Sequence, residues 1–131
     1  MLSGYQDEVT TVSFFSGTAV LGTATLPVFK APFGGATIKS AALAAEAAVT
    51  ANGSNYVTFT LIDGGAAGTT TTAIGTVAGT AGVVVAPTAF AINTALDELD
   101  SGDYLMAKMA RTGSTANNMF AVTVTWARGK G

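Results

Sequence analysis

Short runs in which apolar and polar residues alternate recur along the chain. The clearest is Met119–Arg128, where every second residue is large and apolar: Phe120, Val122, Val124 and Trp126. Successive side chains of a β-strand point to opposite faces, so this period of two predicts a strand. We expect these four residues to lie on the core side of that strand.

Further runs of the same kind predict the rest of the fold. The expected strands are Val9–Phe15, Val20–Phe29, Tyr56–Ile62, Thr69–Val77, Ala89–Asn93 and Tyr104–Arg111. The breaks between them carry glycine, proline, asparagine and serine, which favour turns. About eight short strands separated in this way predict an all-β fold, a single antiparallel β-sandwich or jelly-roll-like domain over residues 9–131.

Residues 1–8 are polar apart from Leu2 and Tyr5, and they predict a short N-terminal arm. Leu2 and Tyr5 are therefore candidate contacts with a partner.

Two segments fit either a helix or a strand. The alanines of Thr37–Thr50 favour helix, whereas their alternation with Leu43 and Val49 favours strand. The Asn52-Gly53 pair that follows is a hairpin signal, so we expect a strand paired with Tyr56–Ile62. Within residues 87–99, Pro87 suits a first helical turn, but the acidic residues near the end oppose the helix dipole. We expect a strand at Ala89–Asn93, followed by a loop or a single helical turn.

The stretch from Val28 to Leu43 predicts a corner of the sheet structure. Pro32 lacks a backbone N–H and ends a strand, and Gly34-Gly35 lets the backbone reverse. The apolar residues around this corner are expected to fill the space beneath it: Phe29, Phe33 and Ile38.

Composition changes this picture in one respect. Hydrophobic residues make up 49% of the chain, but many are alanines, so we expect a thin core. Charged residues make up only 11%, and the net charge is −2. Two interpretations remain open: a surface that is partly covered by other molecules, or a compact threonine-rich soluble domain.

The same composition argues against several function classes. The six basic residues form no cluster, which disfavours nucleic-acid binding. There is no cysteine and no histidine, so thiolate sites and the commonest general base are absent. The acidic N-terminus does not resemble a secretory signal, and the uncharged run Val9–Phe29 is too rich in Thr, Ser and Gly for a membrane helix. We expect no membrane association.

One cluster of titratable residues invites a site: Asp97, Glu98, Asp100 and Asp103. Clustered oxygen ligands suit calcium, but the spacing does not match a calcium-binding loop, so a solvated acidic turn is favoured. No set of residues with the spacing of a catalytic site is apparent. We expect no enzymatic activity, no cofactor and no metal.

Two motifs resemble segments of a known family. Phe29–Ser40 is similar to an "x-APF-x-G-x-I-x-S" corner of small tailed-phage virion proteins, and Leu99–Leu105 resembles their "L-x-x-GD-x-L" turn before a penultimate strand. The final strand Phe120–Trp126 lies where those proteins end. The resembling segments span Val20–Arg128, and the alanine-rich tract Ala45–Val49 departs from the pattern.

The resemblance is to the capsid decoration (cement) proteins of tailed bacteriophages. It implies a β-sandwich or jelly-roll protein of the virion that binds the outer surface of the head, often as a homotrimer, and bridges neighbouring major capsid subunits. It carries no catalytic residues. Two alternatives remain at this point: a head-fibre or tail-associated module that binds a host glycan through an aromatic or acidic pocket, and a small enzyme with a partly buried acid pair.

Overall fold

The computed structural model describes residues 7–16, 23–47, 56–77, 87–113 and 118–130. These residues form strands and turns and contain no helix, so none of them belongs to a helix that could span a membrane. The strands are β1 (Glu8–Ser16), β2 (Thr23–Lys30), β3 (Ala36–Ala45), β4 (Tyr56–Asp63), β5 (Thr72–Val77), β6 (Thr88–Ala89), β7 (Ala91–Ile92), β8 (Glu98–Leu99), β9 (Tyr104–Thr112) and β10 (Asn118–Arg128).

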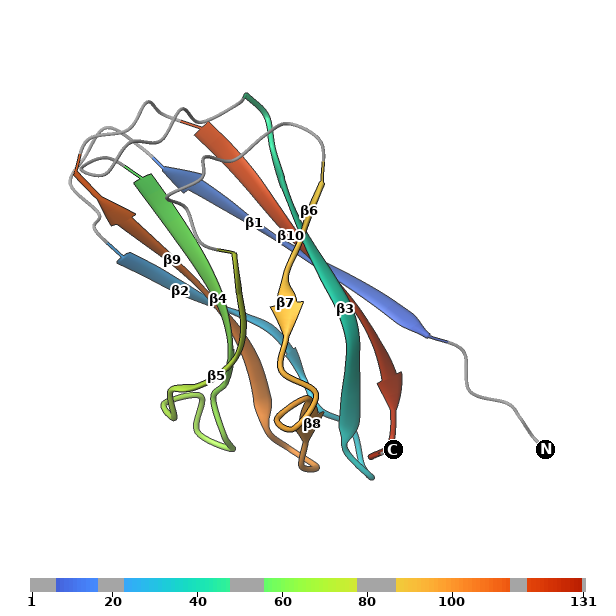
Figure 1. Ribbon diagram of the computed structural model, residues 1–131. Coiled ribbons are helices and arrows are strands. Elements are labelled where there is room, and N and C mark those ends of the chain that lie inside the picture. Colours follow the sequence, from blue (N-terminus) through green and yellow to red (C-terminus); the bar gives the residue numbers. More distant parts are fainter. Residues whose placement is uncertain (1–6, 17–22, 48–55, 78–86, 114–117, 131) are drawn as a thin grey trace.

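The strands form two antiparallel sheets that face each other (Figure 1). The first sheet has the order β1-β10-β3-β6, and β8 pairs with the other end of β3. The second sheet has the order β2-β9-β4-β5-β7. A β-sandwich with one core between two sheets is therefore confirmed.

The pairing of the strands is that of a jelly roll. β1 pairs with β10, β2 with β9, β3 with β6, and β4 with β5, so the pairs are nested within one another. Successive pairs alternate between the first and the second sheet. This is the arrangement obtained when one long antiparallel ribbon is rolled up, and it confirms the jelly-roll prediction.

The predicted alternation holds in the longest strands. Phe120, Val122, Val124 and Trp126 of β10 are all buried. On β4 the buried residues include Val57, Phe59 and Leu61, and on β9 they are Leu105, Ala107 and Met109. Apolar side chains from both sheets thus meet in one core.

Aromatic rings connect the two sheets across this core. Phe59 of the second sheet lies 5.6 Å from Phe14 and 4.9 Å from Phe120 of the first, centroid to centroid. Phe29 of β2 stacks on Trp126 of β10, with centroids 4.1 Å apart and planes 11° apart. Because many other inward positions are alanine, these rings supply much of the core volume.

One edge of the sandwich is closed by a strand that changes sheets. β6 pairs with β3, and β7, two residues later, pairs with β5. Phe90 lies between them and is buried, and its N–H donates to the carbonyl of Ala41. At the opposite edge β1 pairs only with β10, and β2 only with β9, within the described residues.

The two uncertain segments are mainly strand where they are described, and neither contains a helix there. Residues 36–45 form β3, and residues 88–92 form β6 and β7, followed by a turn. The predicted hairpin between 37–50 and 56–62 is wrong, because β3 and β4 lie in different sheets. Both sides of β3 are taken by β10 and by β6 and β8, which leaves no side free for β4. The Asn52-Gly53 pair lies outside the described residues.

The prediction for the corner is wrong in one residue. Ile38 is buried and Phe29 is partly buried, as expected. Phe33 is 98% exposed, because it stands at the tip of the turn between β2 and β3. A residue at a turn tip points away from both sheets, and the alternation along the strands does not extend to it.

Candidate interaction surfaces

The outer face of the first sheet is made of uncharged residues, most of which are small. Alternation and register place them on one side: Val9, Thr11 and Ser13 of β1, Met119, Ala121, Thr123, Thr125 and Ala127 of β10, and Ser40, Ala42 and Ala44 of β3. The exposed hydroxyls of Thr11 and Thr123 share a hydrogen bond of 3.1 Å across the strands. We call this set the uncharged face.

Charged side chains of these three strands gather at one end of the sheet. Glu8, Lys39 and Arg128 lie near the register of Trp126 and Ile38, and Arg128 forms an ion pair with Glu8. The eleven residues of the uncharged face carry no charge themselves, and at its other end Glu46 borders it. A flat sheet surface without charge can pack against another surface with little desolvation of ionic groups.

A second feature lies at the end of the sandwich where the β2–β3 turn meets the acidic segment 97–103. The N–H of Ala31 donates to the carbonyl of Asp103, and the N–H of Gly102 donates to the carbonyl of Ala31. The two turns therefore form one unit. The exposed ring of Phe33 belongs to this unit.

The acidic turn forms an ion pair with the lysine near the C-terminus. Lys130 Nζ donates to Asp100 Oδ1 at 2.7 Å, and this hydrogen bond raises the pKa of Lys130. Desolvation raises the pKa of the Asp103 carboxyl, and the nearby charges of Asp63 and Asp100 raise it further. Among the described residues, no group of three or more carboxylates is placed to hold a metal ion.

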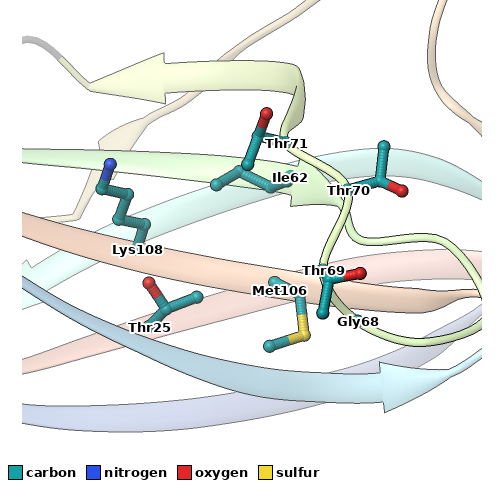
Figure 2. Close-up of a pocket in the computed structure, with 8 residues that line it drawn as sticks. All are labelled: Thr25, Ile62, Gly68, Thr69, Thr70, Thr71, Met106 and Lys108. Atoms are coloured by element: carbon teal, nitrogen blue, oxygen red, sulfur yellow. The ribbon is translucent and has the colours of Figure 1, made fainter.

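A shallow hollow lies on the outer face of the second sheet (Figure 2). Residues of three strands and of the loop after β4 line it: Thr25, Ile62, Gly68, Thr69, Thr70, Thr71, Met106 and Lys108. Its polar groups are threonine hydroxyls and one lysine amine. It offers neither an aromatic ring nor a carboxylate. A second hollow, beside the acidic turn, is lined by Thr37, Lys39, Thr94, Ala95, Asp97 and Glu98, so it does carry carboxylates of the kind that the glycan-binding alternative predicted for its pocket.

The residues proposed from the sequence as partner contacts, Leu2 and Tyr5, lie outside the described residues. Their role stays a prediction. The uncharged face and the exposed Phe33 were not proposed as contacts from the sequence. The low charge content left open whether some surface is covered, and the register shows which strands bring uncharged outward residues together.

No family model matches this sequence, and no curated protein matches it. Among solved structures, a chain of the capsid asymmetric unit of the cyanophage Pam1 is similar, with a TM-score of 0.62. The alignment covers 98% of this chain and 89% of that chain, at 18% sequence identity. The two chains are therefore of similar length and share one fold over nearly their whole extent.

Proposed function

We propose that this chain is a structural protein of a bacteriophage virion. The observation that carries the proposal is the fold shared, end to end, with a similarly sized chain of a phage capsid asymmetric unit. The match spans nearly all of both chains. Jelly rolls recur in viral capsids.

Within that role, we propose a capsid decoration (cement) protein. It binds the outer surface of the phage head and stabilises contacts between major capsid subunits. The motifs at Phe29–Ser40 and Leu99–Leu105 support this finer function, as does the uncharged face. The role needs no catalytic residue, cofactor, nucleic acid or membrane, and we propose that the chain is not an enzyme.

The size of the uncharged face explains why assembly would matter. Three strands about 4.8 Å apart and about nine residues long give a face of roughly 400 Å². A stable interface usually buries about 800 Å² on each partner, so one such contact binds weakly. A homotrimer that contacts several capsid subunits at once would convert weak contacts into tight attachment.

Two measurements test this proposal. Light scattering coupled to size-exclusion chromatography gives the mass of the purified protein, and a homotrimer is expected. Co-sedimentation with heads assembled from the major capsid protein of the same phage should show saturable binding. Decorated heads should also resist heating to a higher temperature than bare heads, because a ligand stabilises the state that it binds. A monomer that does not sediment with the heads would refute the decoration role.

A further inference from the structure

Phe33 is the most exposed large apolar residue of the described chain. Its exposed fraction is 98%, compared with 64% for Val9 and 41% each for Leu96 and Met119. Leaving a phenylalanine ring in water forgoes about 2 kcal/mol of burial free energy. The ring contributes no burial free energy to the folded monomer, which points to a contact with another molecule.

The turn that carries Phe33 is held from both sides by backbone hydrogen bonds. Gly35 N–H donates to Pro32 across the turn at 2.9 Å, and Gly129 N–H donates to the carbonyl of Gly35. On the other side Ala31 is bonded to the 100–103 turn. Gly35 has φ +85°, and a Cβ there would lie 2.4 Å from the carbonyl oxygen of Leu99. The turn is therefore packed tightly against its surroundings.

A turn that is already fixed by hydrogen bonds loses little conformational entropy when its tip binds a partner. A flexible loop loses conformational freedom when it docks, and a pre-organised one loses little. Buried aromatic residues are also the commonest energetic centres of protein interfaces. Exposure and pre-organisation together point to Phe33 as a docking anchor.

The charge around the tip indicates the chemistry of the partner. This end of the sandwich holds six carboxylates and four basic groups, a net charge of −2: Glu8, Asp63, Asp97, Glu98, Asp100 and Asp103 against Lys30, Lys39, Arg128 and Lys130. An interface places opposite potentials against each other. A partner pocket that accepts Phe33 should therefore be apolar inside and basic at its rim.

Two hollows among the described residues match such a pocket poorly in a second copy of this chain. The hollow on the second sheet carries Lys108, but four of its lining residues are threonines. An apolar hollow on the first sheet is lined by Ser13, Ala44, Ala45, Glu46, Met119, Phe120 and Ala121. Its charged lining residue is Glu46, which has the same sign as the tip. Like charges would meet if Phe33 of one copy entered the hollow of another.

We propose that Phe33 anchors this chain in an apolar, basic-rimmed pocket of the major capsid protein. The acidic 97–103 turn faces the rim of that pocket. This inference rests on the proposed decoration function and assigns the contact to one end of the jelly roll.

The test compares variants of the full chain in binding to heads of the same phage. Phe33→Ser should weaken binding at least about 10-fold, as expected for an aromatic anchor. Its thermal midpoint and its mass in solution should match the wild type, because the side chain has no contact to lose within the fold. Phe33→Trp should keep binding, and its indole emission should shift to shorter wavelength on docking, as an exposed ring leaves water.

A matched control removes a partly exposed aromatic side chain elsewhere. Tyr56→Ser, at the end of β4 away from Asp63 and outside both this turn unit and the uncharged face, should bind as the wild type does. Raising the salt concentration from about 0.05 M to about 0.5 M should slow association of the wild type, since screening weakens the attraction to a basic rim.

The outcomes separate the two proposals. Failure of the wild-type protein to bind heads refutes the decoration function itself. Wild-type binding that survives Phe33→Ser unchanged, or that Tyr56→Ser weakens equally, refutes the anchor while leaving the function in place. Loss of binding by Phe33→Ser alone, with binding kept by Phe33→Trp, supports the anchor.

Discussion

Trp126 connects three strands at the edge where the two sheets are not hydrogen-bonded to each other. Its ring stacks on Phe29 of β2, and its Nε1–H donates to Thr10 Oγ1 of β1 at 3.0 Å. Only 5% of the residue is exposed. Removing this side chain should therefore loosen the contact between the sheets at this edge.

The expected magnitude follows from these contacts. Trp126→Ala leaves a large cavity and should lower the free energy of unfolding by about 4 kcal/mol. Trp126→Phe keeps a ring on Phe29 but loses the hydrogen bond and part of the buried area, which together cost about 2 kcal/mol. Thr10→Val leaves the indole N–H without this acceptor and should cost about 1 kcal/mol.

The assay is urea unfolding followed by far-UV circular dichroism, since the fluorescent residue is itself replaced. All variants should be compared at one protein concentration, because association would shift the midpoint. The double variant Thr10→Val, Trp126→Phe should be less destabilised than the sum of the single variants, by about 1 kcal/mol. Additive effects, or a cost below about 1 kcal/mol for Trp126→Ala, would refute the linking role of this side chain.

Two further predictions concern the ends of the strands. The buried amide of Asn118 accepts a hydrogen bond from the N–H of Ala47 and donates one to the carbonyl of Ala47. Asn118→Ala should therefore lower the free energy of unfolding, measured in urea, by about 2 kcal/mol. An unchanged urea midpoint would contradict this. The second concerns pH. The pKa of Asp103 is higher in the folded state than in the unfolded state. Ionisation of this carboxyl therefore lowers the free energy of unfolding as the pH rises from the unfolded pKa through the folded pKa. Below the unfolded pKa the carboxyl is protonated in both states and has no such effect. Asp103→Asn should therefore raise the urea midpoint slightly at pH 7 and have no such effect near pH 3, and high salt should reduce the gain. A larger increase in the urea midpoint at pH 3 than at pH 7 would contradict the raised pKa of Asp103.

The strand pattern of the sequence predicts most of the sandwich. The alternation in residues 119–128 and 56–62 identifies which side chains enter the core, because each strand must bury one face whatever its neighbours are. The breaks at glycine, proline and asparagine separate the strands for equally local reasons. Fold class and core faces are thus properties of short segments.

The interaction surfaces depend on contacts between distant segments. The Asn52-Gly53 signal predicted that β3 and β4 pair, whereas β3 pairs with β10, about 80 residues away along the chain. Only that long-range register brings the outward residues of β1, β10 and β3 together as one uncharged face. The exposure of Phe33 also depends on contacts between distant segments, whereas its apolar character alone predicted that it would be buried.

The exposure of Phe33 is decided by the hydrogen bonds that join the β2–β3 turn to the 100–103 turn and to Gly129. The sequence by itself determined which residues form strands and which of their faces are apolar. Tertiary structure decided which strands are neighbours and which turn tips project, because pairing partners compete across the whole chain whereas alternation is set within each strand.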